Sequence, residues 1–260
     1  LALSGLHLAV VYGLLLLLLK GLSNLVPVLR RKGLKEFIIL FTVWGYVTLV
    51  GFSPSVVRSA VMLTIYSFVS LLNRDRLSVN TLALTAFIML LINPFSLFDV
   101  GFQLSFMAVW AIMVFYSPIY HALSDKLLGK SIIMRYLWAM LVVSFSAQIG
   151  TAPLIMYYFG RFSTVSLFTG FVAIPITTVI LYLAFFMLLL SSFSSIDSFM
   201  GYLVNMLADW LNTFLHWFSL LPWASIEHIH LPLLYVLAYY CLLMILSLPW
   251  SFYMADAELE

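Results

Sequence analysis

Residues 163–190, STVSLFTGFVAIPITTVILYLAFFMLLL, form a predominantly apolar run that contains no charged side chain. The run is longer than the roughly 20 residues that an α-helix needs to cross the hydrocarbon core of a bilayer. Its apolar residues are continuous and do not alternate with polar ones, which favours a helix over a strand of a membrane β-barrel. This stretch therefore predicts a membrane-embedded helix.

Further apolar segments repeat this pattern along the chain. Of the 260 residues, 64% are hydrophobic and only 8% are charged, which is not typical of a soluble domain. We therefore expect an all-α, polytopic membrane helical bundle with about 8–9 transmembrane or re-entrant helices. Two of these segments, 37–52 and 56–72, are short and are joined by the turn at Gly51 to Pro54. They are therefore compatible with a re-entrant hairpin. The other segments are 1–19, 79–93, 97–116, 132–158, 199–221 and 231–253.

The sequence predicts a single transmembrane domain over residues 1–260. We expect it to be a fragment of a longer protein, because it lacks an initiator Met and ends in Leu259-Glu260, which resembles a cloning remnant. The first apolar run lacks the basic residues that begin a signal peptide. Cys241 is the single cysteine, which excludes an intrachain disulfide, and the net charge of +2 is too small for a soluble nucleic-acid-binding protein.

Basic residues are concentrated in alternate loops. Ten of the 12 Lys and Arg residues fall in the first, third and fifth loops, whereas Arg58 and Arg161 lie on the opposite side. The positive-inside rule then makes the odd loops cytoplasmic and places the first residue outside. The cluster Arg30-Arg31-Lys32 is expected to anchor this topology and to touch anionic lipid, or alternatively to contact an emerging nucleic acid.

Arg58 and Asp99 are charged residues within the apolar background. Arg58 follows Pro54 in the first turns of a helix, where a cation opposes the helix dipole and needs a partner. Asp99 is the obvious candidate, because Glu36 and most other carboxylates fall in predicted loops. Both residues are predicted near the outer face, so we expect an ion pair that either fixes helix packing or borders a water-filled path.

Polar residues and prolines in the following helices suggest a lumen. Gln103 shares a helix face with Asp99, and Gln148 and Thr151 come just before Pro153. Pro153 and Pro175 are expected to break their helices and to free backbone carbonyls, which are tolerated in a membrane only inside protein or along a cavity. Gln103, Gln148, Thr151 and His7 are therefore candidates for the pore wall or for a structural polar network.

The segment 198–220 carries a polar stripe of four residues on one helix face, spaced by four, three and four. An amphipathic helix lying in the membrane interface explains it, and so do a buried seam between helices or a pore lining. If this segment lies flat, eight crossings place the C-terminus outside, and if it spans, nine place it in the cytoplasm. The stripe consists of Asn205, Asp209, Asn212 and His216.

The sequence contains no nucleotide-binding, serine-hydrolase or zinc-protease motif, so we expect no enzyme activity, no cofactor and no metal. His228 and His230 lack a distant third ligand. Two other classes stay open. A small-solute or lipid transporter would show two related halves, which are not evident. An intramembrane hydrolase would need to use His7, Asp99 or Asp209.

Five polar stretches break the apolar background, namely Ser4 to His7, Gly51 to Met62, Asp99 to Phe106, Pro153 with Phe159-Gly160, and Pro175. In this order they resemble the competence domain of the ComEC family, the DNA-uptake channel of the bacterial inner membrane. The resemblance covers nearly the whole chain. One position departs from the family pattern, because Gly170 stands where the family usually has Asn, five residues before the second proline.

The resemblance implies transport of one DNA strand into the cytoplasm through a multi-pass channel in the inner membrane. It implies single-stranded DNA, membrane lipids, an external DNA receptor and a cytoplasmic DNA-translocating ATPase as partners, and it leaves a homo-oligomer open. Family members commonly add an external OB-like domain and a nuclease domain, which are not in these residues. Such a pore should attract DNA only weakly, because a passing strand must leave every phosphate contact.

Overall fold

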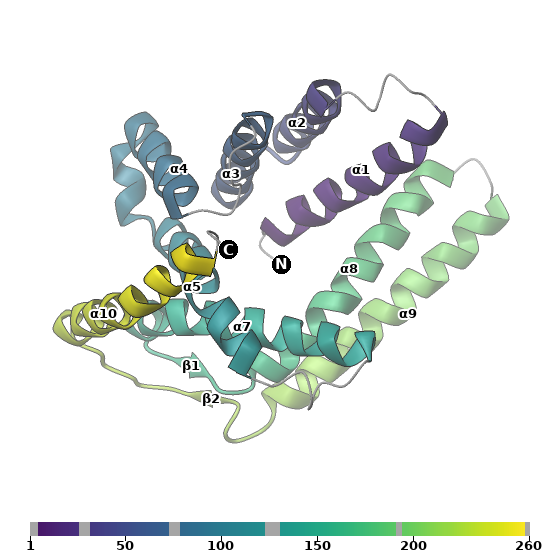
Figure 1. Ribbon diagram of the computed structural model, residues 1–260. Coiled ribbons are helices and arrows are strands. Elements are labelled where there is room, and N and C mark those ends of the chain that lie inside the picture. The colour runs from purple at the N-terminus through teal and green to yellow at the C-terminus, as the bar shows by residue number, and fades with distance from the viewer. Residues whose placement is uncertain (1–4, 26–31, 73–78, 123–130, 191–193, 258–260) are drawn as a thin grey trace. The chain divides into compact units, whose positions relative to one another are not determined.

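A computed structural model describes residues 5–25, 32–72, 79–122, 131–190 and 194–257. Within these ranges the chain forms nine α-helices, one short 3-10 helix and a pair of two-residue strands (Figure 1). The predicted all-α membrane bundle is confirmed, because α3, α5, α7 and residues Ser166–Met187 of α8 are each long and apolar enough to cross a membrane. The elements are α1 (Gly5–Leu25), α2 (Lys32–Leu49), α3 (Pro54–Leu71), α4 (Val79–Ile92), η2 (Pro94–Phe98), α5 (Val100–Ala122), α7 (Ile132–Phe159), β1 (Phe162–Ser163), α8 (Ser166–Leu190), α9 (Ser194–Ser219), β2 (Ser225–Ile226) and α10 (Leu233–Ala257).

Large apolar side chains are exposed on many of these helices. The exposed fraction reaches 73% at Phe41, 75% at Ile92 and 81% at Ile132. Such exposure would be unfavourable in water, but lipid tails solvate these side chains as well as a protein core does. The exposed apolar residues are therefore the surface expected of a helical bundle in a membrane.

One compact unit comprises Leu1–Phe102 together with Ile174–Asn212. Its core lies between α1, α2 and α3, where Ile39, Val43 and Val47 repeat every four residues on α2 and are fully buried. Leu8 of α1 and Val56 of α3 are buried in the same cluster. A spacing of four residues places side chains on one helix face, so α2 packs on its neighbours through a single stripe.

The turn between α2 and α3 reverses the chain at two residues with left-handed backbone. Gly51 has φ of 79° and Phe52 has φ of 55°, and the Phe52 amide donates to the Val47 carbonyl over 3.1 Å. This bond over five residues, next to a glycine, is the usual way in which a helix end satisfies its last carbonyls. Pro54 then begins α3, where its missing N–H is not needed. The helices α2 and α3 consequently lie side by side (Figure 1).

The second compact unit comprises Gln103–Ala173 and Thr213–Glu260. Here α7 packs closely against α5 at Gly150, whose Cα faces the Met107 carbonyl and the Ala111 side chain without room for a Cβ. The strands β1 and β2 pair antiparallel, with Phe162 opposite Ile226. The small residue at position 150 lets the two helix backbones approach, as is common in membrane proteins.

The two prolines do not interrupt their helices as the sequence suggested. Pro153 lies inside α7 and Pro175 inside α8, and both helices continue through them. A proline removes a single N–H donor from the ladder, and neighbouring groups in a membrane bundle can satisfy the freed carbonyl. The argument for a lumen from two broken helices therefore loses its support.

The helix α9 presents its predicted polar stripe outward. Asn205, Asp209, Asn212 and His216 are all exposed. Among the apolar residues, Leu207, Leu211 and Phe214 are half-buried and Trp210 is 49% exposed. At 26 residues α9 is longer than α3, yet it is not among the described helices that are apolar enough to cross a membrane. An amphipathic helix in the interface stays the prediction for this segment.

Candidate functional site

Asp99 stands between a 3-10 helix and α5. The dipeptide Asn93-Pro94 starts η2, because the Asn93 side chain accepts from the Phe95 amide over 3.1 Å and Pro94 occupies the first helical position. After this single turn, Oδ1 of Asp99 accepts from the Gly101 amide over 3.1 Å. Asp99 is therefore the N-cap of α5, and its negative charge favours the start of that helix.

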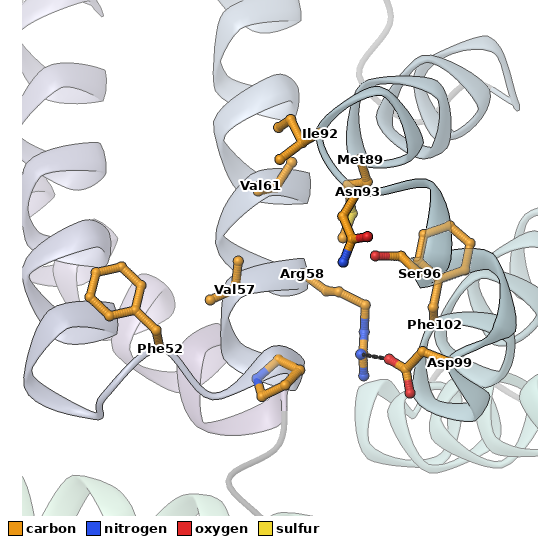
Figure 2. Close-up of a pocket in the computed structure, with 11 residues that line it drawn as sticks. Phe52, Val57, Arg58, Val61, Met89, Ile92, Asn93, Ser96, Asp99 and Phe102 are labelled. Atoms are coloured by element: carbon orange, nitrogen blue, oxygen red, sulfur yellow. Dashed lines mark hydrogen bonds and ion pairs between the residues drawn. The ribbon is translucent and has the colours of Figure 1, made fainter.

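The same carboxylate holds Arg58 of α3. Nη1 of Arg58 donates to Oδ2 of Asp99 over 2.8 Å, so the ion pair expected from the sequence is present (Figure 2). The two side chains differ in environment, because that of Arg58 is 11% exposed and that of Asp99 is 47% exposed. The cation is thus the buried member, and it depends on Asp99 for compensation more than Asp99 depends on it.

Gly101 makes room for the guanidinium. A Cβ at this position would lie 2.7 Å from Nη2 and 3.3 Å from Cζ of Arg58. The backbone of Gly101 does not need a left-handed conformation, so the reason for glycine here is space alone. The sequence Asp99-Val100-Gly101 therefore combines a helix cap, an ion-pair partner and a flat surface on which the guanidinium rests.

A cavity of about 240 Å³ opens beside the ion pair, between α3, α4 and η2 (Figure 2). One part of its wall is polar and contains Arg58, Asn93, Ser96 and Asp99. The volume has room for several water molecules, and the polar wall provides the partners that they need. The rest of the wall is apolar and is formed by Phe52, Pro54, Val57, Val61, Met89, Ile92 and Phe102.

Gln103 lies in the second unit and has a partner on α7. The Tyr158 hydroxyl donates to Oε1 of Gln103 over 2.9 Å, and the Gln103 side chain is half-buried. Gln148 of α7 donates through Nε2 to Oγ of Ser166 at the start of α8 over 2.5 Å. The two amides therefore each join α7 to a different helix, which is one of the roles proposed for them from the sequence.

The remaining candidates are less informative. Thr151 donates to the Ala147 carbonyl of its own helix over 2.9 Å, a common bond of threonine in membrane helices. His7 lies in α1, but the structure does not describe its side chain. The cluster Arg30-Arg31 also lies outside them. Among the described residues no three His, Cys, Asp or Glu side chains gather as a metal site would require.

Sequence reasoning missed several residues of this arrangement. Glu36 was expected in a loop, but it lies in α2 with only 6% of its surface exposed. Gly101 was not recognised as a packing surface, because the side chain that lies against it, Arg58, comes from another helix. Asn93 was not assigned a role, although Asn-Pro is a known signal for a turn.

A sequence model of the family described as "Competence protein" matches residues 1–253. This chain belongs to the competence protein family. It is similar to ComE operon protein 3 of Bacillus subtilis (strain 168), with 32% identity over 178 residues, which are 68% of this chain and 21% of that protein. The matched part thus spans about a fifth of the length of this curated relative. No solved structure matches.

The match to the competence family covers both compact units and both members of the ion pair, since Arg58 and Asp99 fall within residues 1–253. The chain is therefore a membrane protein of the competence family, as its sequence patterns suggested.

Proposed function

We propose that this chain is the channel domain through which one strand of DNA enters the bacterial cytoplasm during natural transformation. The observation that carries the proposal is the match to the competence family over residues 1–253, in a chain built from membrane helices. The similarity to ComE operon protein 3 points in the same direction. The expected activity is conduction of single-stranded DNA and not catalysis.

The charge arrangement suits a conduit for a polyanion. An unpaired arginine inside the membrane would hold each phosphate that reached it, whereas Arg58 is already compensated by Asp99 over 2.8 Å. A passing strand must be released from every site that it contacts, so weak and paired charges are preferable to strong unpaired ones. In this proposal the pair fixes the wall between α3 and α5 and keeps its net charge near zero.

We infer a multi-pass protein of the bacterial cytoplasmic membrane, in contact with lipid over its exposed apolar helices. An external receptor would deliver the DNA, and a cytoplasmic ATPase would supply the driving force. The chain would be a single channel domain of a longer protein, which agrees with the short share of the curated relative that it matches. The polar side chains of Gln103 and Gln148 remain the proposed lining of the path.

The test is DNA internalisation in a competent host from which the gene of this protein is deleted. Labelled duplex DNA is added, and the label bound to the cells is separated from the label protected against external nuclease. We expect binding to persist and protected label to fall to background. Transformation by electroporation is the control, because it bypasses the channel. Normal protection in the deletion strain would overturn the proposal.

A further inference from the structure

Pro153 leaves one carbonyl of α7 without its helical donor. In an α-helix the amide of residue 153 would bond the carbonyl of Ile149, four residues earlier, and proline has no N–H. Pro153 is buried, so water does not replace the missing donor easily. The following residue, Leu154, keeps its N–H, so the missing donor of Pro153 concerns the Ile149 carbonyl and not that of Gly150.

Two neighbouring tyrosines of α10 donate hydrogen bonds to backbone carbonyls of α7 beside Pro153. The Tyr239 hydroxyl donates to the Ile149 carbonyl over 3.0 Å, and the Tyr240 hydroxyl donates to the Gly150 carbonyl over 2.7 Å. The two bonds are not equivalent. Tyr239 supplies the donor that the proline removed, whereas Tyr240 donates to a carbonyl whose residue four positions later, Leu154, still has its N–H.

The same stretch of α7 also contacts two other helices. Gln148 reaches Ser166 at the start of α8, and Gly150 presses on the backbone of α5 at Met107. Four helices of the second unit therefore meet within residues 148–153, and the rotation of α7 there determines where Gln148 points. If the Ile149 carbonyl had no donor, α7 would be less rigid next to the Gln148 side chain.

We propose that Tyr239 is a positioning residue that replaces the helical hydrogen bond lost at Pro153, holds α10 on α7 and thereby fixes the orientation of Gln148. Tyr240 joins the same two helices through its hydrogen bond to the Gly150 carbonyl, but that bond does not replace one lost at the proline. The structural part of this assignment is independent of transport. Its functional part rests on the proposed channel function, because Gln148 is one of the residues proposed to line the path.

A double-mutant cycle separates this role from ordinary packing. The variants are Tyr239→Phe and Tyr240→Phe, each made in the native chain and in a Pro153→Ala chain, with unfolding of the purified full-length protein followed in mixed detergent micelles. Alanine at 153 restores an N–H to the Ile149 carbonyl. We expect Tyr239→Phe to lower the folded-to-unfolded ratio roughly threefold to tenfold in the native chain and hardly at all beside Pro153→Ala.

Tyr240→Phe is the matched control, since it removes the same hydroxyl one residue away and should have the same effect in both backgrounds. An equal loss for Tyr239→Phe with and without Pro153 would overturn the assignment. Pro153→Ser restores the same N–H with a different side chain and should reproduce the alanine result. Failure of both Pro153 variants to fold would also overturn it, because the proposal requires that a residue with an N–H can replace the proline.

DNA internalisation supplies the functional readout. We expect Tyr239→Phe to reduce protected DNA severalfold, because Gln148 is then no longer held in its orientation, and Pro153→Ala to restore it in the double variant. Unchanged internalisation in Tyr239→Phe, in a host where deletion of the gene does abolish it, would overturn the positioning of Gln148. If the deletion itself leaves internalisation normal, the channel proposal fails while the unfolding cycle still decides the role of Tyr239.

Discussion

Replacing the members of the Arg58–Asp99 pair one at a time should give unequal losses of stability. Asp99→Asn keeps an oxygen that can accept from the Gly101 amide, so this change removes the charge and leaves the helix cap largely in place. Arg58→Gln removes the cation and leaves a carboxylate that is 47% exposed. The two variants therefore test the charge pair without testing the start of α5.

The expected magnitudes follow from the difference in burial. Without Asp99 the guanidinium, 11% exposed, stays in the protein uncompensated, and such a change costs about 3–5 kcal/mol. Without Arg58 the half-exposed carboxylate can be hydrated, so the loss should be about 1–2 kcal/mol. The double variant should cost little more than Arg58→Gln alone, because no buried charge is then left unpaired.

The measurements are the free energy of unfolding in mixed micelles and the internalisation of DNA. A charge swap, with Asp at 58 and Arg at 99, should rescue both only in part, because an Arg cannot cap α5 as Asp99 does. Strictly additive losses in the cycle of single and double variants would refute the pairing. A loss for Arg58→Gln as large as that for Asp99→Asn would refute the argument from burial.

Three further predictions concern space, water and topology. Gly101→Ala should displace the Arg58 guanidinium and lower the free energy of unfolding by about 1–3 kcal/mol. The same change at a glycine with open surroundings is the control and should leave the free energy of unfolding nearly unchanged. Cysteine at Gln103 or Gln148, in a chain whose exposed Cys241 is replaced by Ser, should react with a small hydrophilic thiol reagent in intact membranes, and full protection at both would remove them from the path. A periplasm-dependent reporter fused after residue 253 should be active if α9 lies flat, and an active cytoplasmic reporter there would show that it crosses.

The positions of the helices could be predicted from the sequence because lipid leaves the backbone few alternatives. Each expected apolar segment has a helix in the structure, with ends that differ by a few residues. The Arg58–Asp99 pair was also predictable, since a buried cation needs a carboxylate and few were available. Both inferences rest on strong constraints, namely backbone hydrogen bonding and charge burial, that act wherever a chain enters a membrane.

The contacts that define the second unit were not predictable in the same way. Pro153 was expected to break its helix, and what satisfies the freed carbonyl there is Tyr239, which lies 90 residues from Ile149 in sequence. No local pattern specifies which hydroxyl will reach a given carbonyl across such a distance. The space at Gly101 was missed for the same reason, because the side chain that fills it comes from α3.

The two members of the Arg58–Asp99 pair are synthesised at different times. The ribosome makes Arg58 41 residues before Asp99, and at about 5–20 residues per second the arginine waits roughly 2–8 s for its partner. During that interval α3 carries an uncompensated cation, which costs about 2.5–3.5 kcal/mol at the centre of a bilayer and less near the outer face, where Arg58 is expected. The pair that compensates Arg58 can form only after η2 and the first turn of α5 have been made, so α3 reaches its full stability in the membrane only when these later residues are present.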